Sequence, residues 1–144
     1  MDKLLSDGDF VQLLRLHARE IINILIKKGI SFSLFVDIDQ VQFDPILPKN
    51  ISSTFQPITM FAIDGYTFET LEIDEKNVYF EAGFGLENIG SELTIPLSAI
   101  VQMSVDDNIL FINQFAHLIL DTKEDDIDKS MNIFLSNPEN KDLF

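Results

Sequence analysis

The run from Val78 to Met103 constrains the fold of this chain more than any other stretch. Within it, apolar residues take every second position, at Val78, Phe80, Ala82 and Phe84. A period of two indicates a β-strand with one face on a core. Turn residues then follow at Gly83, Gly85 and Gly90. A second strand at residues 92–96 and an apolar run at 97–103 complete a predicted hairpin with a return segment.

Residues 9–28 are predicted to form a helix. Asp7 or Asp9 can cap its start, and Gly29 stands where a left-handed residue commonly ends a helix. Its apolar residues recur at helical spacing but form an unusually wide stripe, which leaves two interpretations open. Either the helix is deeply packed within one chain, or its second face pairs with another subunit.

Residues 31–38 are predicted to form a strand, because apolar residues alternate along them. Two apolar, β-prone runs follow later in the chain. Residues 58–64 are predicted to be a strand that ends at a tight turn, Asp64-Gly65. Residues 66–73 are predicted to be the returning strand of that hairpin. The apolar phase of this second run slips, which predicts a bulge near residues 69–70.

The remaining segments are less regular. Residues 39–57 are predicted to be irregular and to lack regular pairing over most of their length, because prolines interrupt them at Pro45, Pro48 and Pro57. Residues 109–113 fit a strand, and a helix capped by Asp106 or Asp107 fits as well. One helix followed by five or six short strands predicts a mainly β fold: a strongly bent antiparallel sheet, or partly open barrel, with the helix against it.

Residues 1–120 are predicted to form one domain, and residues 121–144 an acidic, flexible tail. Within the tail, residues 131–135 (MNIFL) are an apolar segment that could bind another surface.

The charge balance limits the possible partners. The formal net charge is −14, and such a surface repels nucleic acid and anionic membranes. Apart from solubility, this charge favours neutral or basic peptides and proteins as partners. No apolar run reaches the roughly 20 residues that span a bilayer, and the N-terminus does not resemble a signal peptide. A cytoplasmic protein is the resulting expectation.

No catalytic constellation is visible in the sequence. The chain has two histidines and no cysteine, so thiolate chemistry is excluded and a zinc site is not expected. The glycines match neither a dinucleotide fingerprint nor a phosphate-binding loop. We therefore expect a binding protein rather than an enzyme, with no metal and no cofactor.

Three segments, in this order and spacing, resemble the stringent starvation protein B (SspB) family of bacterial proteolysis adaptors. FSLFVDI after an N-terminal helix is similar to the family's first strand. VYFEAGFG is similar to its aromatic-x-Ala-x-Phe-Gly strand, and LTIPLSAIVQM to its return strand after a proline. The resemblance covers roughly residues 10–113.

The resemblance implies an Sm-like bent barrel that dimerises through the N-terminal helix. Interface candidates on that helix are Leu14, Ala18, Ile22 and Leu25. The implied function is recognition of ssrA-type degradation tags, or other degron peptides, and delivery of tagged proteins to the ClpXP protease. The alternative is a protein–protein assembly module on the same barrel, without delivery to a protease.

By position, the implied peptide groove lies around residues of the two central runs. These are Phe61, Ile63, Asp64, Phe68, Phe80, Ala82, Gly83 and Phe84. Small residues at positions 82 and 83 would let a peptide backbone approach closely. The tail departs from the family, whose last residues form a basic and hydrophobic module that docks on ClpX. Here NPENKDLF holds one lysine and no arginine, so either residues 131–135 serve this role or the protein binds peptides without delivering them.

Overall fold

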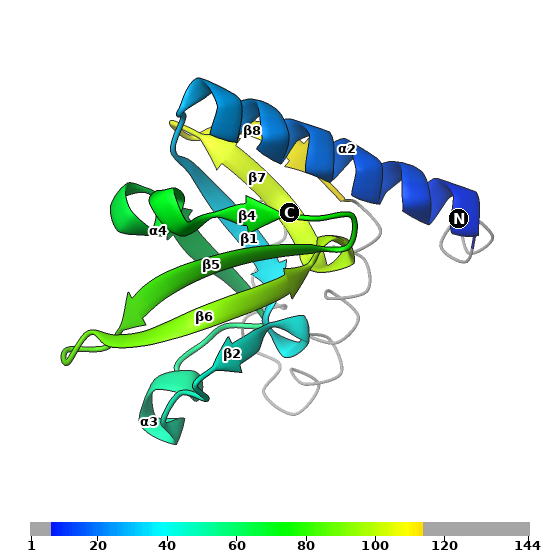
Figure 1. Ribbon diagram of the computed structural model, residues 1–144. Helices are drawn as coiled ribbons and strands as arrows, with labels where there is room; N and C mark the ends of the chain where they lie inside the picture. Colours follow the sequence, from blue (N-terminus) through cyan, green and yellow to red (C-terminus); the bar gives the residue numbers. More distant parts are fainter. Residues whose placement is uncertain (1–6, 114–144) are drawn as a thin grey trace, which may run out of the picture.

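A computed structural model describes residues 7–113. They form a long N-terminal helix and two four-stranded antiparallel sheets (Figure 1). The first sheet has the strand order β3-β1-β7-β8, and the second has the order β2-β6-β5-β4. The prediction of a mainly β fold with an N-terminal helix is confirmed, whereas the described strands form two sheets and not a closed barrel.

The N-terminal helix α2 spans Gly8–Lys28. The Phe10 N–H donates a hydrogen bond of 3.0 Å to the Asp7 carboxylate, so Asp7 is the N-cap, and Asp9 lies within the first turn. Gly29 ends the helix with a φ of 67°. The helix lies across the first sheet (Figure 1). Within residues 7–113, no helix has the length and hydropathy needed to cross a bilayer.

The first sheet is built around β1, which pairs with β3 on one side and β7 on the other. Its strands are β1 (Phe32–Asp37), β3 (Ile58–Ile63), β7 (Ile100–Val105) and β8 (Asn108–Ile112). Residues 108–112 are therefore a strand, reached by a turn in which Asp106 and Asp107 have φ angles of 49° and 67°. The same choice between strand and helix for residues 114–120, and the tail predicted at residues 121–144, lie outside the described residues.

The second sheet contains the predicted hairpin. Its strands are β2 (Gln42–Asp44), β4 (Glu72–Ile73), β5 (Asn77–Phe84) and β6 (Ile89–Pro96). Gly85 lies in the turn with a φ of 75°. Gly90, predicted to belong to the turn, instead pairs with Gly83 inside the hairpin. A 3-10 turn, η2 (Leu97–Ala99), then leads into β7.

The hairpin predicted at Asp64-Gly65 is wrong. Residues Gly65–Thr70 form a short helix, α4, and β3 pairs with β1 rather than with the residues that follow it. The Thr70 hydroxyl accepts a hydrogen bond from the Glu81 N–H at 2.9 Å, which holds α4 against β5. The slip in apolar phase that suggested a bulge therefore marks a change from helix to strand.

The segment predicted to be irregular, residues 39–57, contains two regular elements. Besides β2, it holds the short helix α3 (Lys49–Ser52), which follows Pro48. The 3-10 turn η1 (Ile38–Gln40) precedes β2. Phe43 in β2 pairs with Leu93 of β6. Prolines thus flank the short elements and do not lie inside them.

The core fills the space between α2 and the two sheets. The predicted inward phase of β5 is confirmed, since Val78 and Phe80 are buried. Other large, fully buried side chains are Ile22, Leu34, Val36, Ile63, Leu93, Ile95, Leu97, Ile100 and Met103.

Candidate functional site: an apolar cleft beside the β5–β6 hairpin

Three residues assigned to the groove by sequence lie in the core. Phe61, Ile63 and Phe80 have exposed fractions of 6%, 0% and 1%. Each belongs to the strand phase that faces the space between the sheets. These side chains pack in the core, and any part they have in a peptide groove stays a prediction.

The other predicted groove residues are nearer the surface, at α4 and on β5. Phe68 of α4 is half-buried and packs against the core, and Asp64 is exposed at the start of that helix. Ala82 and Phe84 are half-buried, and Gly83 is exposed. Two separate hollows contain the last three residues: Phe84 lines one of them, and Ala82 and Gly83 line the other.

A cluster of five phenylalanines supports the first hollow. Phe55 stacks on Phe43 with a centroid distance of 5.7 Å and contacts Phe84 edge-to-face at 6.0 Å. Phe61 contacts Phe84 at 6.2 Å and Phe80 at 5.8 Å. Edge-to-face pairs of this kind are favourable because the positive ring edge meets a negative ring face. The cluster joins β2, β3, β5 and the segment after α3.

An apolar cleft of about 500 Å³ lies where this cluster reaches the surface. We call it the hairpin cleft, and it is lined by Pro48, Asn50, Ile51, Thr54, Phe55, Phe84, Gly85, Leu86, Glu87 and Ile89. A Cβ on Gly85 would lie 3.0 Å from Ile51 Cδ1, so glycine allows the turn to approach α3 closely. Only one charged residue, Glu87, belongs to this lining.

The second hollow, of about 280 Å³, is polar and acidic. Its lining includes Asp44, Glu81 and Glu92, which lie directly opposite one another across β2, β6 and β5. The Tyr66 hydroxyl donates a hydrogen bond to Glu81, and this bond raises the pKa of Tyr66 above its ordinary value. Across residues 7–113, no group of three or more histidine, aspartate or glutamate side chains is placed to hold a metal ion.

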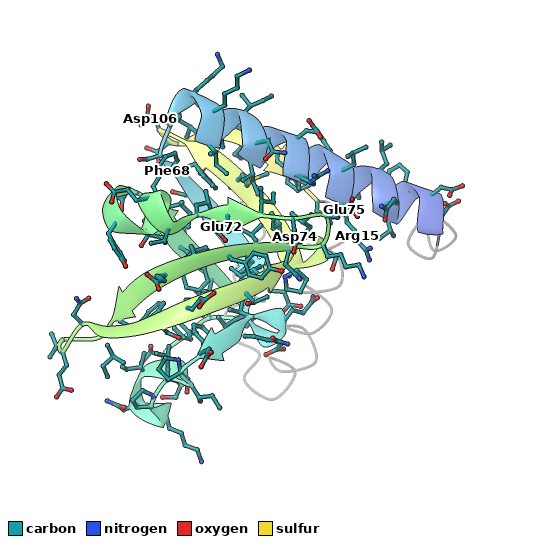
Figure 2. All side chains as sticks on the ribbon, viewed as in Figure 1. Arg15, Phe68, Glu72, Asp74, Glu75 and Asp106 are labelled. Atoms are coloured by element: carbon teal, nitrogen blue, oxygen red, sulfur yellow. The ribbon has the colours of Figure 1, made fainter. Side chains whose placement is uncertain are left out.

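A second tyrosine–carboxylate pair holds the turn between β4 and β5, where Asp74 and Glu75 are labelled in Figure 2. The Tyr79 hydroxyl donates a 2.6 Å hydrogen bond to Asp74. That bond, together with the Asn77 and Lys76 N–H groups, lowers the pKa of Asp74, and the same bond raises the pKa of Tyr79. The pair fixes the entry into β5.

The residues proposed for a dimer interface mostly point into the chain's own core. Ala18, Ile22 and Leu25 are buried there, and Leu14 is half-buried. A different part of the same helix is exposed and apolar. Its exposed residues are Leu13, Leu16 and Ile24.

Strand β8 contacts α2 and also carries exposed apolar residues. His17 of α2 contacts Phe111 of β8 with a centroid distance of 5.4 Å, so the two elements touch. On β8, the exposed apolar residues are Ile109, Leu110 and Ile112. We call this surface of α2 and β8 the helix–edge face.

Four residues at the cleft were not predicted from the sequence: Phe43, Phe55, Ile51 and Leu86. The first three lie in the proline-containing segment, which has no apolar period from which a face could be assigned. Leu86 lies in a turn, where its apolar character was the only feature of the sequence that could have indicated a binding role.

No protein-family model matches the chain, and no curated protein matches its sequence. The resemblance to the stringent starvation protein B family therefore remains a prediction.

Proposed function

We propose that this protein is a non-catalytic, peptide-binding adaptor that recognises ssrA-type degradation tags and delivers tagged proteins to the ClpXP protease. In this proposal the two sheets are the halves of an Sm-like, strongly bent barrel, and the protein works in the cytoplasm as a homodimer. The hairpin cleft carries the proposal. It is of a size that holds a few apolar side chains, and it is lined mainly by apolar and aromatic groups with a few polar ones.

The strand β3 supports the same proposal. It is an edge strand that pairs with β1 alone among the described strands. An extended peptide can add to such an edge through backbone hydrogen bonds while its side chains enter nearby pockets. Phe61 of β3 contacts Phe55 and Phe84, and both of these residues line the hairpin cleft. An edge for the backbone and a cleft for side chains thus lie close together.

Leu86 provides the direct test. It lines the cleft and is fully exposed, so Leu86→Glu should leave the fold intact. We expect the variant to bind a fluorescent ssrA-type peptide roughly tenfold to a hundredfold more weakly, because burial of one leucine contributes about 1.5–3 kcal/mol. Ile46→Glu is the matched control, since Ile46 is also highly exposed and lies outside the cleft lining.

Fluorescence anisotropy with the full chain measures both affinities. Absence of binding to any ssrA-type peptide would refute tag recognition. Equal weakening by the two glutamate variants would place the peptide elsewhere. Delivery is tested separately: the full chain should accelerate degradation of a tagged reporter by ClpXP.

The second candidate function is an assembly module without delivery to a protease. The helix–edge face favours it, because exposed apolar residues beside a strand that is at the edge of the described sheet commonly mark a protein–protein contact. A pull-down that recovers one stable partner, and neither ClpX nor tagged chains, would support this candidate over the adaptor.

A further inference from the structure

We propose that the chain's own residues Met131–Leu135 occupy the hairpin cleft when no partner peptide is bound. The inference rests on the proposed function, because it names the regulation of the same cleft. The segment MNIFL carries no charge, and the cleft lining contains only one charged residue, Glu87. Seating the segment there therefore needs no ion to be stripped of water.

Chemical fit distinguishes the cleft from the other hollow. The hairpin cleft is lined by four aliphatic or aromatic side chains besides its two phenylalanines: Pro48, Ile51, Leu86 and Ile89. The second hollow presents three carboxylates, and residues 121–128 before the segment are also acidic. Like charges would keep this part of the chain away from the second hollow.

The connection is long enough to reach the cleft. The Asn113 N–H donates to the Val101 carbonyl at 2.9 Å, which fixes the place where the described chain ends. Ile89 lines the cleft and lies 12 residues before Val101, so Asn113 is at most about 45 Å from it. Met131 follows Asn113 by 18 residues, and an extended chain of that length spans up to roughly 60 Å.

Covalent connection favours the chain's own segment over a free one. A tethered ligand competes at an effective concentration in the millimolar range when its linker can span the distance. A short apolar segment with weak intrinsic affinity can therefore fill the cleft within its own chain. An incoming peptide must displace the segment, so only peptides of sufficient affinity or concentration bind to the cleft.

The absence of cysteine from the whole sequence permits an unambiguous test. In the full chain, Ser136→Cys is labelled with a nitroxide, and the amide signals of the isotope-labelled protein are measured. We expect paramagnetic broadening at residues 85–89 and 49–52, abolished by Phe134→Ser in the same labelled chain. Lys141→Ser, a substitution outside the segment, should leave the broadening in place.

Three outcomes would overturn the inference. Broadening could be absent, or confined to the helix–edge face. It could also arise when isotope-labelled chains are mixed with separate spin-labelled chains, which would mean that a second copy supplies the segment.

Peptide affinity then separates this inference from the proposed function. If the segment fills the cleft about nine-tenths of the time, Phe134→Ser should bind an ssrA-type peptide roughly tenfold more tightly than the unmodified chain. Broadening at the cleft without any peptide binding by either protein would sink tag recognition and leave the inference standing. Peptide binding of equal strength in both proteins, without broadening, would sink the inference alone.

Discussion

The side chain of Asn88 fills the space that a Cβ atom on Gly83 would occupy, with its Oδ1 atom 1.8 Å from that position. Gly90, which lies opposite Gly83 in the hairpin, has open space at the corresponding point. The two glycines therefore have different roles, although they form one cross-strand pair.

This difference predicts unequal responses to alanine. Gly90→Ala should stabilise the hairpin by about 0.5–1 kcal/mol, because glycine in a strand loses more conformational entropy on folding. Gly83→Ala should give a free energy of unfolding about 1 kcal/mol lower than Gly90→Ala does, since the Asn88 side chain must rotate away from the new Cβ atom. Urea unfolding measures both. The difference should vanish in an Asn88→Gly background, and its persistence there would contradict the steric explanation.

The start of α2 gives a second prediction. Asp7→Ala should lower the free energy of unfolding by about 1 kcal/mol, because it leaves the Phe10 N–H without its capping carboxylate. Asp9→Ala is the matched control, since Asp9 lies in the first turn, where its charge interacts with the helix dipole, and is not the N-cap. Thermal unfolding of the two variants distinguishes them. Equal losses would argue against Asp7 as the specific cap.

The Tyr79–Asp74 hydrogen bond predicts a pH dependence. The folded pKa of Asp74 is depressed, so its contribution to stability is present above the unfolded pKa of about 3.9 and is lost as the pH falls through the folded value. Tyr79→Phe should move the pKa of Asp74 upward, toward its ordinary value. Carbon-13 titration of the Asp74 carboxyl measures this shift.

The same bond acts at alkaline pH with the opposite sign. The folded pKa of Tyr79 is raised, so its contribution is present below the unfolded pKa of about 10 and is lost as the pH rises through the folded value. Tyr66→Phe is the control, because Tyr66 bonds to Glu81 instead. If that control moved the pKa of Asp74 as far as Tyr79→Phe does, the assignment to Tyr79 would be wrong.

The helix–edge face predicts where a second copy would bind. Ile24→Glu places a charge on its exposed part, and we expect any dimer to dissociate while the monomer keeps its fold. Ile22→Glu should instead unfold the chain, because Ile22 is fully buried. Analytical ultracentrifugation and circular dichroism report the two effects. A dimer that survives Ile24→Glu would move the interface elsewhere.

The sequence was most informative where one long period was present. Twenty-one residues of α2 repeat the helical pattern between two capping signals, and the eight residues of β5 alternate throughout. Helix α4 has only six residues, too few to display a period, and its tyrosine, phenylalanine and threonines are typical of strands. Its helical state follows from tertiary contacts, such as the bond from Glu81 to Thr70.

The site was harder to predict than the fold for a related reason. Alternation shows that Phe80 and Phe84 share a phase, but Phe80 lies deep between the sheets and Phe84 reaches the surface. How deeply a strand residue is buried depends on which other segments pack over it. Phe84 is partly covered by Phe55. Residue 55 lies in a segment whose position no local pattern specifies.

The phenylalanine cluster also determines when during folding the hairpin cleft forms. Its members come from residues 43 to 84 and from three different strands and a loop. Contacts so distant in sequence form late, after the entropy of closing the intervening loops has been lost. A nascent or partly unfolded chain therefore lacks the cleft, and the proposed recognition of peptides would require completed folding.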